Sequence, residues 1–434
     1  MYAFLHYSLN TYTDQEWGFG NEDPVLFNPS QLDVKQWVTT CKNAGMRGII
    51  LTAKHHCGFC LWPSQYTDFS VKSSPWRDGK GDVVRELSDE CRRQGLKFGV
   101  YLSPWDRHHP QYGQHEYITY FRNQLEELLT QYGNIFEVWF DGANGGDGWY
   151  GGANEKRKID RMTYYQWSDT YRLIRQWQPE VCIWADVGTR ADLRWVGTEA
   201  GYVGTTNWSL LNEGKAPKEA LHYGEIDADA WVPGEVDTSI RPGWFYHERE
   251  DSLVKTADQL MDIYLKSVGR NATLLLNFPI MPNGRIHPTD SLHGAQFYER
   301  IRATFGNDLA RNAKISVKRS IPSDTLHAAE MLLAFQQPTT FNCVQLQEDI
   351  ALGQRVKRFA LDAWVDGAWK PLDDMLAERP ADDTTHVDAL TTIGYKRIVC
   401  FPEVSASKLR IRILEAKAQP VIKQVGVYYD SLLK

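Results

Sequence analysis

The stretch Ile135-Phe-Glu-Val-Trp-Phe-Asp141-Gly142 decides the fold of this chain. Its apolar part is short and almost continuous, which is typical of a parallel β-strand that is buried on both faces. An acid and a glycine follow at once, so a carboxylate is expected where the strand ends and the chain turns. Four more runs of this kind occupy residues 48–53, 97–103, 181–186 and 272–278. We therefore predict a sheet of parallel strands.

Amphipathic helices are expected between these strands. Apolar residues recur at helical spacing within residues 34–41, 84–91, 121–132 and 257–268. Asp82 is a candidate N-cap of the second helix, and Gly45 and Gly95 are candidate C-terminal stops of the first two. Strand and helix that alternate in this way are typical of an α/β barrel or an open doubly wound sheet.

Polar residues at the ends of the strands favour the barrel. His55 and His56, residues 103–106, Asp141 and Asp186 each follow an apolar run. A barrel brings all those ends to one face, where the active sites of such folds lie. No glycine-rich phosphate loop follows the first strand, which disfavours an open dinucleotide-binding sheet. The first part of the chain is therefore predicted to be a (β/α)8-like TIM barrel.

The pattern changes after about residue 310. Helical periods disappear, and short alternating segments follow at residues 359–365, 396–401, 408–414 and 422–428, with turn residues such as Asp366-Gly367 after the first. This pattern is typical of an antiparallel β-sandwich. We predict two domains, a catalytic barrel over residues 1–308 and a C-terminal β-sandwich over residues 309–434.

Composition excludes several classes of protein. The chain has 434 residues and a net charge of −7, and it lacks a run rich in Lys and Arg, so a nucleic-acid or anionic-membrane partner is not expected. No apolar stretch approaches the ~20 residues of a membrane span. The first residues lack a secretory signal, which leaves two readings open, a cytoplasmic protein or a leader that was removed. Three of the seven cysteines are expected to be buried thiols: Cys41, Cys91 and Cys182.

Two carboxyl groups would give this barrel the chemistry of glycoside hydrolysis. One acts as nucleophile and forms a glycosyl-enzyme intermediate, and the other protonates the leaving oxygen. Asp141 is the first candidate because it ends a buried strand, although a turn or N-cap aspartate is nearly as common there. Spacing does not choose the second among the downstream acids, which are Asp186, Glu199, Glu225, Glu235 and Glu248.

His55-His56 and nearby aromatic residues complete the candidate site. Adjacent imidazoles at a strand end project in different directions, so at least one should face the pocket. The run His55-His56-Cys57-x-x-Cys60 also allows a zinc site, but no second ligand pair with structural-zinc spacing appears. Trp139 shares a strand face with Asp141, and Glu16-Trp17 places an acceptor beside an aromatic plane, which suits a sugar ring.

Together these residues resemble glycoside hydrolase family 29, the α-L-fucosidases. The matching segments are Phe4-Leu-His6, Glu16-Trp17, Ala53-Lys-His55-His56, Gly99-Val-Tyr101, Glu137-Val-Trp139-Phe-Asp141-Gly and Arg194-Trp-Val-Gly-Thr-Glu199. The last segment is similar to subfamily B, which prefers α-1,3/1,4-linked fucose. The resemblance covers most of the chain, and the C-terminal part looks like the galactose-binding-like jelly roll that often accompanies such barrels.

The resemblance implies a role for each matched residue. Asp141 matches the nucleophile and Glu199 the acid/base of a retaining mechanism, in which the two carboxyls lie ~5–5.5 Å apart. We expect burial beside Trp195 and the charge of Asp141 to raise the pKa of Glu199. Matched positions line the fucose pocket: His6, Glu16, Trp17, His55, His56, Tyr101, Trp139 and Trp244.

The resemblance also implies a fucosylated oligosaccharide or glycoconjugate as substrate, no metal or other cofactor, and a periplasmic or secreted location. Two features depart from the family pattern. Cys57 stands where the family has an acid, and residues 145–161 form a long insertion that bears on substrate preference. Two other classes stay open, a non-catalytic glycan-binding protein on the same scaffold and a metal-dependent hydrolase built on His55, His56 and Cys60.

Overall fold

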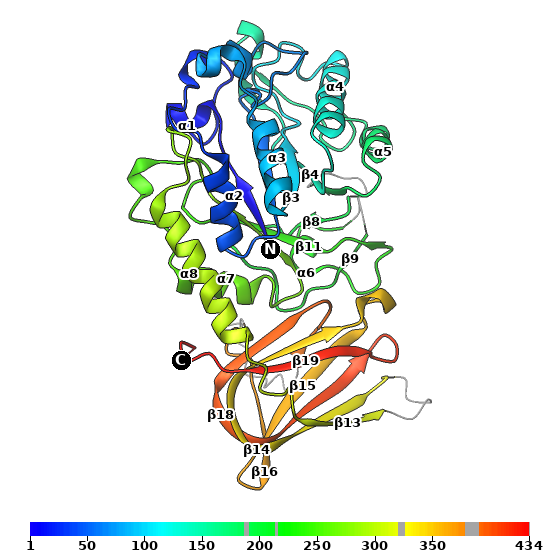
Figure 1. Ribbon diagram of the computed structural model, residues 1–434. Coiled ribbons are helices and arrows are strands. Elements are labelled where there is room, and N and C mark those ends of the chain that lie inside the picture. Colours follow the sequence, from blue (N-terminus) through cyan, green and yellow to red (C-terminus); the bar gives the residue numbers. More distant parts are fainter. Residues whose placement is uncertain (186–190, 213–215, 320–325, 378–389, 434) are drawn as a thin grey trace.

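The computed structural model describes residues 1–434 except 186–190, 213–215, 320–325, 378–389 and 434. It has two parts, an α/β barrel and a β-rich C-terminal domain that lies against one end of the barrel (Figure 1). The N-terminus lies at the barrel end that faces this domain. The strands of the barrel run away from the domain, so their C-terminal ends open at the far side.

Eight parallel strands form the barrel, in the same order in space as in the chain. They are β1 (Tyr2–Leu5), β2 (Gly48–Lys54), β3 (Lys97–Leu102), β4 (Glu137–Phe140), β7 (Cys182–Ala185), β8 (Arg194–Trp195), β11 (Gly234–Ser239) and β12 (Thr273–Asn277). The parallel pairing of β1 with β12 continues the ring. An isolated parallel bridge between Trp184 and Leu193 joins β7 to the approach of β8. The predicted TIM-like barrel is therefore confirmed.

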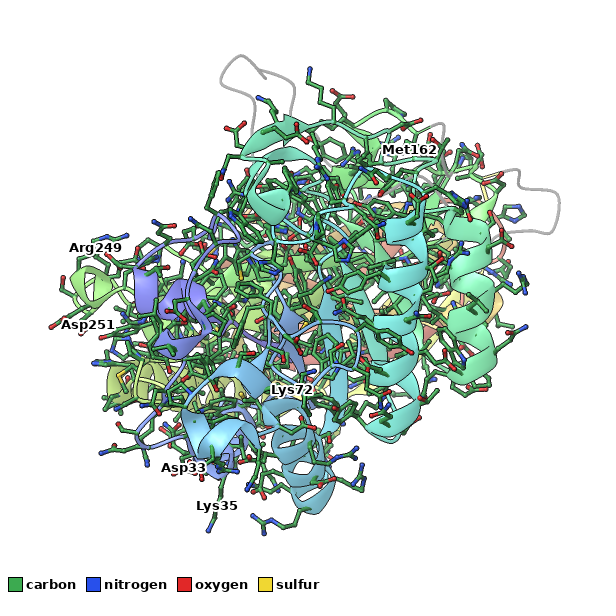
Figure 2. The ribbon with its side chains drawn as sticks, turned by 90° about the horizontal axis from the view of Figure 1, so that it is seen from above. Asp33, Lys35, Lys72, Met162, Arg249 and Asp251 are labelled. Carbon is green, nitrogen blue, oxygen red and sulfur yellow. The ribbon has the colours of Figure 1, made fainter. Side chains whose placement is uncertain are left out.

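Helices cover the outside of this ring (Figures 1 and 2). The longer ones are α2 (Val34–Asn43), α3 (Val83–Gln94), α4 (Glu116–Gln131), α5 (Trp167–Trp177), α7 (Ala257–Lys266) and α8 (Pro288–Phe305), and the short ones are α1 (Leu9–Thr13) and α6 (Ala220–Tyr223). Asp82 accepts from the Arg85 N–H as the predicted N-cap of α3, and Gly95 ends that helix with a φ of 78°. Charged side chains such as Lys35 and Arg249 project outward (Figure 2).

Smaller elements sit in the connections. Antiparallel pairs form between β5 (Gly146–Gly148) and β6 (Glu155–Arg157), and between β9 (Leu210–Leu211) and β10 (Ala230–Trp231). Single turns of 3-10 helix occupy Pro24–Leu26, Val71–Ser73, Trp76–Gly79, Tyr150–Gly152, Glu248–Glu250 and Ile350–Leu352. The β5–β6 hairpin lies inside the insertion over residues 145–161.

The C-terminal domain is antiparallel β-structure, as predicted. Its strands are β13 (Lys314–Arg319), β14 (Ala329–Glu348), β15 (Val356–Val365), β16 (Ala368–Pro371), β17 (Leu390–Thr391), β18 (Arg397–Ala416) and β19 (Ile422–Tyr428). The sequence predicts residues 396–401 and 408–414 as two segments, but all of them except Lys396 belong to the one long strand β18. The pairing of β18 with β14 shifts register near the middle, and both halves contribute side chains to one apolar core, among them Leu333, Val344, Phe401 and Ile411.

Hydrogen bonds fasten this domain to the barrel segment that follows β8. The Thr206 and Thr391 hydroxyls are 2.7 Å apart, and the Asn207 N–H donates to the Thr392 hydroxyl. The Gln354 side chain accepts from the Ser209 N–H at 2.8 Å. Helix α8 ends at Phe305 and β13 begins at Lys314, while the predicted boundary at residue 308 stays a prediction.

The cysteines differ from expectation at one position. Cys41 and Cys91 are buried as predicted, but Cys182 is exposed. It is the first residue of β7, where the strand has not yet entered the core, so its place in an apolar run did not imply burial. Among the described residues, no helix combines the length and the apolar character that crossing a bilayer requires.

Candidate active site

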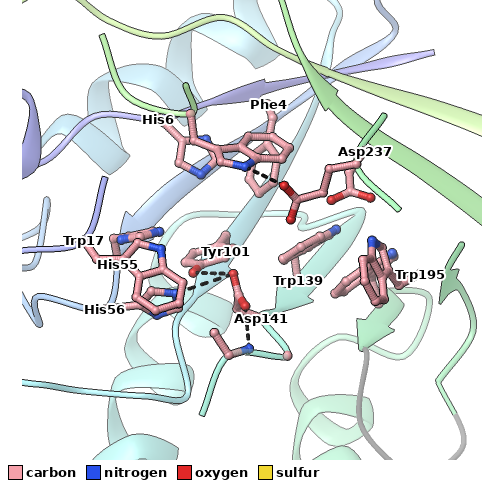
Figure 3. Close-up of a pocket in the computed structure, with 15 residues that line it drawn as sticks. Phe4, His6, Trp17, His55, His56, Tyr101, Trp139, Asp141, Trp195 and Asp237 are labelled. Carbon is pink, nitrogen blue, oxygen red and sulfur yellow. Dashed lines mark hydrogen bonds and ion pairs between the residues drawn. The ribbon is translucent and has the colours of Figure 1, made fainter. Parts of the chain in front are cut away.

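A cavity of about 200 Å³ opens at the C-terminal ends of the barrel strands. It is smaller than the roughly 300–1,000 Å³ typical of sites for drug-sized ligands. In the close-up, His55 and His56 lie across from Trp195 and Asp237, with Asp141 between them (Figure 3). The lining residues are Phe4, His6, Trp17, His55, His56, Tyr101, Trp139, Asp141, Gly142, Ala143, Trp184, Trp195, Glu199, Asp237 and Trp244.

Asp141 follows β4 directly, and two hydrogen bonds hold its carboxylate. The Tyr101 hydroxyl donates to Oδ2 at 3.1 Å, and the Ala143 N–H donates to Oδ1 at 2.7 Å. The Nε2 atom of His56 lies 3.7 Å from Oδ2. Burial raises the pKa of Asp141, whereas the bonds from Ala143 and Tyr101 lower it. The side chain keeps 26% of its surface exposed, so the carboxylate is fixed yet open to the cavity.

Glu199 lies at the cavity mouth, on the segment that follows β8, and is exposed. The indole N–H of Trp244 donates to its Oε2 atom at 3.1 Å. Desolvation raises the pKa of Glu199, the bond from Trp244 lowers it, and the nearby carboxylates of Asp141 and Glu16 raise it. The upward direction agrees with the sequence prediction, and desolvation is the larger cause.

Glu16 supports the wall of the cavity from behind. It is not among the lining residues; its carboxylate accepts from the backbone N–H groups of Trp244 at 2.9 Å and Phe245 at 3.1 Å. His247 Nε2 lies 2.7 Å from Glu16 Oε1. Glu16 thus sets the loop that carries Trp244. Apart from Glu16, every predicted site residue lines the cavity.

Three buried imidazoles form a neutral polar wall. Burial is the main cause that lowers the pKa of His6 and of His56 to about 3, and it lowers the pKa of His55 well below the usual range. His6 Nδ1 lies 2.8 Å from Asn277 Oδ1, and His56 Nδ1 lies 2.7 Å from Ser103 Oγ. Neutral imidazoles both donate and accept, which suits sugar hydroxyls.

Stacked aromatic rings form the floor of the cavity. The rings of Trp139 and Trp184 are parallel within 8°, with centroids 3.5 Å apart, and Tyr101 stacks on Trp139 at 5.4 Å. Trp17 stands at the rim with 51% of its surface exposed. Apolar ring faces beside carboxylates and imidazoles match the apolar C–H faces and polar edges of a sugar.

The cavity also selects among the candidate second acids. Glu199 lines it, whereas Glu225 accepts from the Asn212 N–H and Glu248 is an exposed residue of a 3-10 turn. Glu235 is buried deeper in the barrel, where Trp139 donates to it. Asp186 lies outside the described residues.

Comparisons with known proteins agree with this geometry. The family model "Alpha-L-fucosidase" matches residues 2–293. The chain belongs to the α-L-fucosidase family. It is 39% identical to "Alpha-L-fucosidase 1" of Arabidopsis thaliana over 460 residues, which cover 99% of this chain and 85% of that protein. It is therefore a glycoside hydrolase.

Solved structures of fucosidases share its fold. A glycoside hydrolase family 29 member from an unknown rumen bacterium superposes with a TM-score of 0.93 at 62% identity, covering 100% of this chain and 76% of that one. A family 29 fucosidase of Ruminococcus gnavus in complex with fucose superposes with a TM-score of 0.84 at 28% identity, covering 100% and 92%.

The departures from the family pattern lie beside the cavity of this fucosidase. Cys57 is buried, with its thiol 3.4 Å from the Ser8 hydroxyl, and burial raises its pKa to about 12. Cys60 accepts a bond from Gln124 at 3.3 Å. Over the described part of the chain, no cluster of three His, Cys, Asp or Glu side chains is arranged to hold a metal ion. The thiols therefore act as small buried side chains.

The insertion packs behind the cavity rim. Tyr150 accepts from the Trp105 indole N–H at 2.9 Å, and Arg107 Nε donates to the Asp147 carbonyl at 2.6 Å. Trp105 in turn meets the rim residue Trp17, with ring centroids 5.5 Å apart. None of the lining residues comes from 145–161.

Sequence reasoning missed one charged lining residue, Asp237, and one aromatic, Trp184. Asp237 sits on β11, whose sequence Gly-Glu-Val-Asp-Thr-Ser has polar residues on its inner face and so lacks the apolar run of a buried strand. Its alternation of Val236 with acids was the available signal. Trp184 lies inside a predicted strand, but nothing in the sequence distinguishes it from a residue of the hydrophobic core.

Proposed function

We propose that this enzyme is an exo-acting, retaining α-L-fucosidase that removes terminal α-1,3/1,4-linked fucose from glycans. The observation that carries the proposal is that Asp141 and Glu199 line one small cavity on an aromatic floor. A cavity of about 200 Å³ suits one sugar ring, which supports removal of a terminal residue.

Asp141 is proposed as the nucleophile. Its carboxylate attacks the anomeric carbon while Glu199 gives its proton to the departing oxygen, which forms a fucosyl-enzyme ester and frees the aglycone. Glu199 then takes a proton from water, which attacks the same carbon, releases fucose and restores the Asp141 carboxylate. Tyr101 and the Ala143 N–H hold the nucleophile during both steps.

Glu199 is proposed as the acid/base. Its exposed position among the lining residues supports this role, since the aglycone must leave and water must enter on the open side of the cavity. A raised pKa keeps it protonated for the first step, since a general acid works best with a pKa near the operating pH. No step in this mechanism calls for a metal ion, and activity that is insensitive to chelators would discard the metal-dependent alternative on His55, His56 and Cys60.

Substitution of the two acids tests the assignment. Asp141→Ala should abolish turnover of an aryl α-L-fucoside, and Glu199→Gln should lower turnover of an unactivated fucoside by about 10²–10⁴-fold. Glu248→Gln is the matched control, because Glu248 is an exposed candidate acid outside the cavity. If Asp141→Ala kept full turnover, the assignment of Asp141 as nucleophile would be refuted. If the unmodified enzyme released no fucose, the non-catalytic glycan-binding alternative would stand.

Stereochemistry and linkage need separate measurements. NMR of the first-formed product should show α-fucose, and β-fucose would refute retention. Digestion of α-1,2-, α-1,3-, α-1,4- and α-1,6-fucosides should release fucose fastest from the 1,3 and 1,4 linkages. The segment Arg194-Trp-Val-Gly-Thr-Glu199 supports this preference through its resemblance to subfamily B.

Two further proposals concern the location of the enzyme and its C-terminal domain. The periplasmic or secreted location follows from the family resemblance, and cell fractionation tests it. The C-terminal domain is proposed to support the barrel mechanically, because its hydrogen bonds reach Thr206, Asn207 and Ser209, which follow Glu199 closely in the chain.

A further inference from the structure

Asp237 is a third carboxyl group in the cavity, and the mechanism above does not use it. Alternation along β11 turns Glu235, Asp237 and Ser239 toward the barrel interior. Glu235 accepts from the Trp139 indole, and Ser239 accepts from the Asn277 amide at 3.0 Å. Asp237, between them, is only 2% exposed and lines the cavity.

One oxygen of Asp237 is left without a partner. Its Oδ1 atom is buried and has no hydrogen-bond partner among the described residues. Leaving a buried acceptor unsatisfied opposes folding, so most such atoms in proteins are paired. A polar group that breaks this rule beside a ligand cavity is expected to serve function rather than stability.

The surroundings favour the protonated form of this carboxyl. Burial raises the pKa of Asp237 well above its usual range, and the carboxylates of Glu199, Glu235 and Asp141 raise it further. The imidazoles of the cavity are neutral and offer no compensating charge. A protonated carboxyl carries one O–H donor and one carbonyl acceptor, the same pair of functions that a sugar hydroxyl can engage.

We propose that Asp237 is a substrate-binding residue whose carboxyl group bonds a ring hydroxyl of the sugar in the cavity. This inference rests on the proposed function and adds a polar contact on the β11 side. His55 and His56 lie on the opposite side of the cavity (Figure 3). Polar groups on two sides would fix the orientation of the ring over Trp139.

Two variants separate this role from a structural one. Asp237→Asn keeps a neutral donor and acceptor of nearly the same shape, so kcat/KM on an aryl α-L-fucoside should stay within about threefold. Asp237→Leu removes both functions, and it should lower kcat/KM by up to about tenfold, mainly through KM. Because Leu also removes a buried, unsatisfied acceptor, it should raise the melting temperature.

Controls keep each outcome interpretable. Thr238→Val alters the neighbouring residue on the other face of β11 and should keep wild-type kinetics. L-Fucose should raise the melting temperature of the wild type and of Asp237→Asn more than that of Asp237→Leu. Asp237→Ala repeats the test without a larger apolar side chain if the Leu variant does not fold.

Three results would overturn the inference. Wild-type KM in both Asp237→Leu and Asp237→Ala would show that the residue does not bind substrate. A lower melting temperature together with lost activity would indicate a structural role, and an Asn variant as impaired as Leu would indicate an ionised carboxylate. Failure of the proposed function is distinct, because the wild type itself would then release no fucose.

Discussion

Replacing Tyr101 with Phe tests how the structure prepares Asp141. The Tyr101 hydroxyl is buried and donates to Asp141 Oδ2 at 3.1 Å. A hydrogen bond to a charged group contributes about 1.5–3 kcal/mol. One decade of rate corresponds to about 1.4 kcal/mol, so loss of that bond in the reacting geometry predicts a fall in kcat/KM of roughly 10- to 100-fold.

The pH profile gives this prediction a sign. The Tyr101 bond lowers the pKa of Asp141, so its removal raises that pKa. The acid limb of kcat/KM, where Asp141 as the proposed nucleophile must lose its proton, should therefore move to higher pH in Tyr101→Phe. The assay is Michaelis–Menten kinetics on an aryl α-L-fucoside across pH 3–8.

Tyr7→Phe supplies the control. Tyr7 is equally buried, but its hydroxyl bonds the Tyr12 hydroxyl at 2.6 Å, away from the cavity lining. This variant should lose roughly 1 kcal/mol of stability and keep its pH profile. If Tyr101→Phe had wild-type kcat/KM and an unmoved acid limb, Asp141 would not depend on this contact, and the reasoning about the nucleophile would fail.

Three other predictions concern the walls and the barrel interior. Trp244→Phe removes the donor that lowers the pKa of Glu199, so the basic limb of kcat/KM should move to higher pH; an unchanged limb contradicts this. Glu16→Ala leaves two backbone N–H groups of the Trp244 loop without their acceptor, so KM on the aryl fucoside should rise by about 10-fold. An unchanged KM would show that Glu16 does not position this loop. The pKa of Glu235 is raised to about 7 from an ordinary 4.5, mainly by burial, so the folded state binds a proton that the unfolded state releases between these values. Because Glu235 hydrogen-bonds the buried Glu137, this proton belongs to the pair. Stability should fall as pH rises from 4.5 to 7, and Glu235→Gln should make that fall shallower in denaturant titrations.

Most of the barrel could be predicted because its strands are continuously apolar. The runs that contain β2, β3, β4, β7 and β12 are largely apolar and almost wholly buried. Strand β11 escaped prediction for the opposite reason, since the cavity and the barrel interior place Glu235 and Asp237 on its inner face. Helix α5 was missed although Trp167, Tyr171 and Ile174 show the helical spacing.

The site was predicted only in part for a related reason. A carboxylate after a strand marks Asp141, because strand ends converge in a barrel. Nothing local marks Glu199, which lies in an irregular segment after the two-residue strand β8. Its choice over Glu225 and Glu248 came from the family resemblance, and only the folded chain shows that it shares a cavity with Asp141.

The anchoring of residues 205–209 on the C-terminal domain bears on how such enzymes diversify. Thr391, Thr392 and Gln354 hydrogen-bond Thr206, Asn207 and Ser209, only a few residues beyond Glu199. Loops at the rim can then change length and composition between lineages without displacing Glu199, the proposed acid/base. An exchange of the C-terminal domain by recombination would have to preserve these hydrogen bonds. The barrel and the C-terminal domain should therefore be inherited together.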